Sequence, residues 1–319
     1  MKIRFWGVRG SIPSPIKGHM IKSKIKKVLS LAKPSDILDE KSIENFINSL
    51  PFSMVSTYGG NTTCIEVRTS KNEILIIDGG TGMRELGQSL MNEGFRHGKG
   101  IAHILMTHSH WDHIQGIPFF EPLYVKGNIF HFHGIHPDIE ERLRYQNHFE
   151  HFPVSFDQMQ ATKYFHIHKE GEVFQIYDLK INSKALRHPG ISYAYKIQEN
   201  DKIFVFSSDA EFRFDNKDLD SYIEFFSDAD VLVFDTQYTL DEQLLMKIDW
   251  GHSSANIATD LALKANVKNL ILFHHDPSYN DEMIDQVYQK AIKYKDIVDY
   301  DNSHSLQIFI AYESFELDL

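Results

Sequence analysis

The sequence lacks several features that would place a protein outside the cell or in a membrane. Its one cysteine, Cys64, cannot form an intramolecular disulfide, which fits a reducing compartment. We expect Cys64 to be buried, because free cysteine usually is. No apolar run approaches the length of a membrane span, and residues 1–8 contain too short an apolar run for a signal peptide. The expected location is the cytoplasm, without membrane contact.

Positive charge is also in short supply, since 33 lysine and arginine residues face 44 acidic residues and leave a net charge of -11. This balance argues against broad, non-specific binding to nucleic acid or to an anionic membrane. It does not argue against a small phosphodiester substrate, because a bound metal ion supplies its own positive charge. Nucleic acid stays open as a partner without being favoured, and a homodimer stays open as well.

What the chain does have is a hydrophobic fraction of 42%, enough for a large core. Apolar strand patterns occur at 2–6, 63–68, 74–77, 101–106, 179–186, 203–206, 231–234, 267–273 and 306–310, and helical patterns at 83–91, 138–146, 254–265 and 282–294. Strands that alternate with helices are typical of an α/β fold. Because no repeat or linker is evident, one domain spanning 1–319 is the simplest organisation.

An inserted helical segment at about 14–56 interrupts this pattern near the N-terminus. A lysine cluster crowds its start, formed by Lys22, Lys24, Lys26 and Lys27. Such a cluster is typical of a solvated helix face; the alternative is an electrostatic guide for an anionic substrate.

The most informative segment is His108-Ser109-His110-Trp111-Asp112-His113, just past the apolar pattern 101–106. Imidazole and carboxylate groups are good ligands for zinc-like ions. Residues two apart on an extended segment point the same way, so His108 and His110 can bind one ion. Asp112 and His113 lie on the following turn and can reach a second ion. A site for a single metal ion is the alternative.

Three further residues of metal-ligating type occur in the same context, each after an apolar strand pattern. They are His188, Asp209 and His274. Open α/β sheets place their ligands at such strand ends. The carboxylate of Asp209 can bridge two ions.

In order and spacing, these seven residues resemble the metallo-β-lactamase superfamily, over the chain from Lys2 to about Ser278. The resemblance implies a four-layer αββα sandwich with two divalent metal ions at one edge of its two sheets. It implies that His108, His110 and His188 bind the first ion and that Asp112, His113 and His274 bind the second, with Asp209 between them. Asp78 matches the buried aspartate behind the ligands. Zinc is the expected metal, with manganese or iron as alternatives.

Two later segments favour a phosphodiesterase branch of the family. Gly251-His252-Ser253-Ser254 resembles the Gly-His-Ser-Thr segment of ribonuclease Z, and 272–277 resembles its final ligand segment, with His274 rather than His275 as the ligand. The segments 5–11 and 58–63 resemble bacterial members labelled cyclic-nucleotide phosphodiesterase-like. The chain departs from ribonuclease Z because it lacks the long glycine-rich arm that grips transfer RNA.

The resemblance therefore implies a metal-dependent hydrolase that cleaves a phosphodiester with a metal-bridging hydroxide as nucleophile. The substrate classes that fit are a cyclic nucleotide, a cyclic phosphate and a nucleic-acid-derived phosphodiester. Asp112 would orient or deprotonate the nucleophile, and His252 would stabilise charge or protonate the leaving oxygen. The alternatives are a thioesterase of the glyoxalase II type and a non-catalytic metal-binding interaction module.

Two other histidine pairs fall outside this ligand set. His131 and His133 alternate along one strand pattern, and His166 and His168 along another. Neither pair has an adjacent Asp-His, so we expect ordinary polar strand faces.

Overall fold

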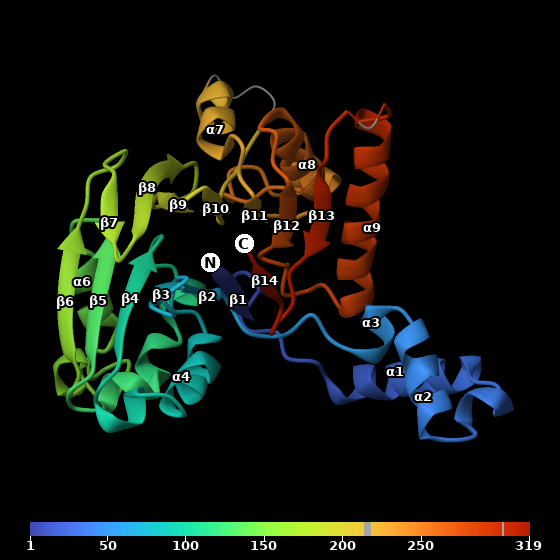
Figure 1. Ribbon diagram of the computed structural model, residues 1–319, viewed down its shortest axis with the longest axis horizontal. Helices are drawn as coiled ribbons and strands as arrows, with labels where there is room; N and C mark the ends of the chain where they lie inside the picture. Colours follow the sequence, from blue (N-terminus) through green and yellow to red (C-terminus); the bar gives the residue numbers. More distant parts are fainter. Residues whose placement is uncertain (214–217, 302) are drawn as a thin grey trace.

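The computed structural model describes residues 1–213, 218–301 and 303–319. Within these residues two seven-stranded sheets pack face to face, and helices cover the outer face of each (Figure 1). This is the predicted four-layer αββα sandwich. None of the helices in the described part of the chain is both long and apolar enough to cross a membrane.

The first sheet is built mostly from the N-terminal half of the chain. In spatial order its strands are β14 (Glu316–Asp318), β1 (Lys2–Gly7), β2 (Cys64–Arg68), β3 (Ile74–Ile77), β4 (Ile101–Met106), β5 (Ile129–Gly134) and β6 (Thr162–Ile167). From β3 to β6 neighbouring strands run parallel, so their carboxyl ends meet at one edge of the sandwich.

The second sheet contains the remaining strands. In spatial order these are β13 (Gln307–Ile310), β12 (Asn269–Phe273), β11 (Val231–Asp235), β10 (Lys202–Ser207), β9 (Ser192–Glu199), β8 (Leu179–Leu186) and β7 (Phe174–Ile176). Strands β10 to β13 run parallel. Strands β7 and β14 lie outside the predicted strand patterns, because three-residue strands are too short to show a periodic pattern.

Three apolar clusters separate the layers. One lies between the sheets and includes Phe5, Leu105 and Phe206. A second joins the first sheet to α4 (Met83–Met91), α5 (Trp111–Ile114) and α6 (Ile139–Gln146). A third joins the second sheet to α7 (Leu219–Phe226), α8 (Ala255–Lys264) and α9 (Asp281–Val298). Cys64 is fully buried on β2, as expected.

The inserted segment forms a helical arm of α1 (Gly18–Leu31), α2 (Glu40–Ser49) and α3 (Phe52–Val55) that projects from the body (Figure 1). Every residue of α1 and α2 is exposed or half-buried. The arm contacts the body through α3, whose Phe52 packs on Tyr58 and Tyr312. Lys24 and Lys27 pair with Asp281 and Glu282 at the start of α9. Two of the four clustered lysines are therefore held in ion pairs with the body.

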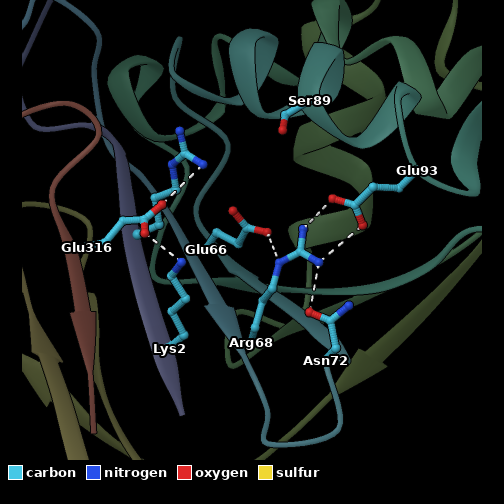
Figure 2. Close-up of a pocket in the computed structure, with 8 residues that line it drawn as sticks. Lys2, Glu66, Arg68, Asn72, Ser89, Glu93 and Glu316 are labelled. Carbon is cyan, nitrogen blue, oxygen red and sulfur yellow. Dashed lines mark hydrogen bonds and ion pairs between the residues drawn. The ribbon is translucent and has the colours of Figure 1, made fainter.

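A surface pocket of about 290 Å³ lies between β1, β2 and α4, far from the strand ends described below (Figure 2). Arg68 bonds to Glu66 and Glu93, and Lys2 pairs with Glu316. The acidic and basic side chains that line this pocket thus largely neutralise one another. We interpret it as a surface ion-pair cluster rather than a site for an anionic substrate.

We propose that the chain is one domain and that the arm is an appendage to it. Replacement of residues 18–49 by a flexible Gly-Ser linker should leave the unfolding of the sandwich cooperative, because α1 and α2 bury none of the described core. The midpoint of thermal unfolding should change by no more than about 4 °C. Circular dichroism during heating measures this. A loss of the cooperative transition would contradict the proposal.

Candidate metal centre

Five strands deliver polar side chains to one edge of the sandwich, at the point where each strand ends. Asp78 follows β3, His108 follows β4, His188 follows β8, and Asp209 and His274 follow β10 and β12. The backbone φ of Asp78, Asp209 and His274 lies at 57°, 58° and 62°, a conformation that side-chain-bearing residues rarely adopt. Backbone strain of this kind gathers at functional sites.

The first group of converging side chains contains His108, His110, His188 and Asp209. His110 Nδ1 and His188 Nε2 lie 3.0 Å apart. Asp209 Oδ2 lies 3.8 Å from His108 Nε2 and 3.7 Å from His188 Nε2. One ligand atom from each of the four lies within 4.8 Å of the others, close enough to surround a single ion.

The second group contains Asp112, His113, Asp209 and His274. His113 Nε2 lies 3.0 Å from Asp209 Oδ1 and 3.3 Å from Asp112 Oδ2. His274 Nε2 lies 3.1 Å from Asp112 Oδ2 and 3.3 Å from Asp209 Oδ1. Asp209 thus directs one oxygen toward each group. The structure brings together all seven predicted ligands in the two predicted sets.

Asp78 fixes the orientation of two of these rings from behind. Its carboxylate lies 2.8 Å from His113 Nδ1 and accepts a 2.7 Å hydrogen bond from Thr107 Oγ1. Since that hydroxyl donates to Asp78, it accepts from His108 Nδ1 at 3.0 Å. Both imidazoles then carry hydrogen on Nδ1 and present an Nε2 lone pair to the groups in front, as metal-ligating histidines do.

Gly251 orients His188 in the same way. Its carbonyl oxygen lies 2.9 Å from His188 Nδ1, and its φ is 85°. A Cβ at this position would lie 2.2 Å from that nitrogen, so glycine is required. The carboxylate of Glu211 accepts a hydrogen bond from Gly251 N–H and holds the loop in place.

The charges of the second group fit a cation. Burial opposes charge on His113 and His274, but the carboxylates of Asp209 and Asp112 outweigh it. They raise the pKa of His113 well above its usual value and that of His274 to about 9. The Nε2 atoms of His113 and His274 both face carboxylate oxygens of Asp112 and Asp209. Lone pairs that face one another repel unless a cation lies between them, and a divalent metal ion meets that need.

The first group fits an ion through its neutral imidazoles. Burial lowers the pKa of His188 to about 4, and with the nearby His113 lowers that of His108 well below its usual value. Nε2 of His108 is buried and makes no hydrogen bond to any described residue. Neutral rings keep their lone pairs available to a metal at neutral pH.

A second histidine–carboxylate pair borders both groups. His252 Nδ1 lies 2.7 Å from Asp235 Oδ2, and the His252 ring lies 5.2 Å from His188 and 5.1 Å from His274. Asp235 was not predicted as a site residue, although it ends the apolar strand β11 much as Asp209 follows β10. Ser11 was not predicted either, and its N–H donates to Asp112 Oδ2 at 2.8 Å.

The neighbouring His275 does not join either group. Its Nε2 lies 2.8 Å from the carbonyl oxygen of Ala311, and the ring is buried away from the carboxylates. The structure thus places His274, the residue favoured by sequence, in the site.

Two solved structures share this fold. The metallo-beta-lactamase fold protein YhfI from Bacillus subtilis superposes with a TM-score of 0.64 at 18% identity, covering 99% of each chain. Zn(2+)-bound PqqB from Methylobacterium extorquens superposes with a TM-score of 0.63 at 16% identity, covering 100% of each.

Sequence comparison then gives the family. Residues 74–275 match the beta-lactamase superfamily domain, and the chain belongs to this family. Ribonuclease Z of Oceanobacillus iheyensis is 25% identical over 60% of this chain and 77% of its own length. The chain is a metal-dependent hydrolase of the ribonuclease Z-like type, and the predicted enzyme class is confirmed.

Replacement of Asp78 by Asn should weaken metal binding by about 10–100-fold, because both His108 and His113 lose their fixed orientation. Competition with a fluorescent chelator measures the affinity.

The matched control is Asp230→Asn. Asp230 is a buried carboxylate on the same sheet as Asp209, bonded to Ile203 N–H and Lys268. The Asp230→Asn variant should keep full metal affinity. Equal losses of metal affinity in both variants would show that Asp78 has no specific role.

Proposed function

We propose that the protein is a phosphodiesterase that works with two divalent metal ions, zinc first among them. The observation that carries this proposal is the position of Asp209 between two complete ligand groups. When bound, such a pair of ions supplies an activated hydroxide at neutral pH and positive charge for the transition state. The resemblance of the chain to enzymes named ribonuclease Z supports a phosphodiester as the bond that is cleaved.

Asp112 has the contacts of a residue that orients the attacking group. One oxygen, Oδ2, faces His113 and His274 and also accepts the hydrogen bond from Ser11 N–H. This fixes the carboxylate against rotation. We assign to Asp112 the orientation of the nucleophile and acceptance of its proton.

His252 is placed to serve the leaving group. Asp235 holds its Nδ1, which leaves Nε2 to donate a proton to the departing alkoxide oxygen. The buried Asp235 carboxylate, 0% exposed, stabilises the imidazolium before that transfer. Gly251 positions both rings, since it bonds to His188 and directly precedes His252.

Asp209→Ala should remove the shared ligand of both groups. Metal content should fall below one equivalent, and the rate of hydrolysis of bis-p-nitrophenyl phosphate should fall by about three orders of magnitude. Elemental analysis and a colorimetric assay measure the two quantities.

Glu282→Ala is the control, because Glu282 is an exposed carboxylate at the start of α9 that pairs with Lys27 of the arm. It should keep metal and activity. Full activity in Asp209→Ala, or turnover of thioesters but not phosphodiesters by the wild type, would refute the proposal.

The role of His252 can be separated from metal binding by the choice of leaving group. His252→Ala should slow cleavage of a dinucleotide by about 10²–10⁴-fold, because its alkoxide needs a proton. Cleavage of bis-p-nitrophenyl phosphate should slow far less, since p-nitrophenolate leaves unprotonated. Asp235→Asn should show the same asymmetry in weaker form. Equal losses on both substrates would mean that His252 acts otherwise.

A further inference from the structure

Five histidines form an array away from the metal centre, on the inner face of the first sheet. His103 comes from β4, His131 and His133 from β5, and His166 and His168 from β6 and the residue just beyond it. The parallel register pairs His103 with His131 and His133 with His166. Alternation along each strand turns all five rings to one side. His131, His133, His166 and His168 were expected to form ordinary polar strand faces. The structure adds His103 and packs the five rings together, with His133 buried and the other four half-buried.

The array consists of two hydrogen-bonded rows. In the first, His103 Nδ1 lies 2.8 Å from His133 Nε2, and His133 Nδ1 lies 3.0 Å from His168 Nε2. In the second, His131 Nδ1 lies 2.9 Å from His166 Nε2. The rows stack on each other, with ring centroids 4.5 Å apart for His103 and His131 and 4.6 Å for His133 and His166.

These contacts restrict the protonation of the array. Each contact between two ring nitrogens needs one N–H and one lone pair. His133 uses both of its nitrogens, so it can bond to His103 and His168 at once only when the row is in matched tautomers. A fully protonated ring has two N–H groups and no acceptor, so a second proton in a row breaks a bond and adds charge repulsion.

Aromatic side chains of the second sheet cover the array. The Phe174 ring, on the edge strand β7, lies parallel to His168 with centroids 3.5 Å apart. Tyr177, just after β7, meets His103 edge-on at 4.6 Å. From the first sheet, Tyr164 lies parallel to His131 at 5.1 Å. The neutral array is therefore part of the contact that holds β7 against β4, β5 and β6.

The charged groups near the array only partly favour its protonation. Glu172, between β6 and β7, favours charge on His168, and Glu73 acts on Tyr177. Asp178, after Tyr177, is paired with Lys71. Burial, reinforced by the neighbouring imidazoles, lowers the pKa of His103 to about 4 and that of His133 to about 2. The pKa values of His131 and His168 are lowered for the same reasons.

We propose that the histidine array is an acid-labile contact between the two sheets, which releases β7 when it takes up protons. Strand β7 is the edge of its sheet and pairs with β8 from Phe174 to Ile176. Strand β8 ends at Leu186, two residues before His188 of the metal centre. Loosening of β7 would thus be transmitted toward the first ligand group.

The direction of the pH effect follows from proton linkage. Well above pH 6.5 the imidazoles of His103 and His133 are neutral in both the folded and the unfolded chain, so their neutral form in the array does not lower stability. As the pH falls from 6.5 toward 4, the unfolded or released segment binds protons that the intact array excludes. Each histidine kept neutral then lowers the equilibrium constant for the closed state by about tenfold per pH unit.

The test compares the thermal midpoint and the hydrogen exchange of β7 at pH 7.5 and pH 5.5. The double variant His103→Phe/His133→Phe keeps aromatic packing but removes two of the titrating rings. Acidification should lower its thermal midpoint by less than half as much as it lowers that of the wild type. The amide hydrogens of β7 should stay protected from exchange. The metal centre is identical in both proteins, so its own acid response cancels in the comparison.

His97→Gln is the control, because His97 is an exposed histidine in the short helix Phe95–His97, outside the array. On acidification, the thermal midpoint of this variant should fall as much as that of the wild type. If the double variant does not fold, NMR titration of the wild-type histidines decides instead, with His103 and His133 neutral at pH 5.5. Unchanged acid sensitivity in the double variant, or titration of His103 and His133 near pH 6.5, would overturn the proposal.

Discussion

The carboxylate of Asp209 is buried between the two sheets, and the active edge of the sandwich is arranged around its charge. Burial alone would raise its pKa, but His113, His274 and His108 hold it well below the usual range. These partners come from both sheets, because His108 and His113 follow β4 and His274 follows β12. A buried carboxylate is tolerated only when it is paired, so the strand-end loops of both sheets have to bring these imidazoles to Asp209.

Much of this arrangement could be predicted from sequence because it depends on strand ends. Parallel strands bring their carboxyl ends to one edge, so ligands that are far apart in the chain but follow apolar strands must meet there. His188, Asp209 and His274 were found in this way. Asp235 carries the same signal and was missed because it lies in no recognised motif. The contribution of Gly251 could not be predicted, since it rests on a carbonyl oxygen and on a close approach that a sequence does not show.

The parts that could not be predicted depend on contacts between segments without a shared motif. The inserted helices were expected. Their projection from the body was not, because it depends on which helix faces pack against the sandwich, and no residue of α1 or α2 is buried. The histidine array depends on the register between β4, β5 and β6, which places His103 beside His131. A shift of one residue would turn these rings to the opposite face of the sheet, and the sequence does not show which residue of a neighbouring strand each histidine faces.

The two histidine clusters show how surroundings decide the chemistry of one residue type. Both contain His-x-His pairs, both lie at or between the same sheets, and both hold ring nitrogens about 3 Å apart. Around the second ligand group, carboxylates raise the pKa of His113 and His274, so the rings attract a cation. In the array, imidazoles face imidazoles and aromatic rings, which lowers the pKa of His103 and His133 and leaves a neutral, hydrogen-bonded packing surface. The difference between a metal centre and a packing surface therefore lies in the carboxylates, which Asp209, Asp112 and Asp78 supply at the metal centre.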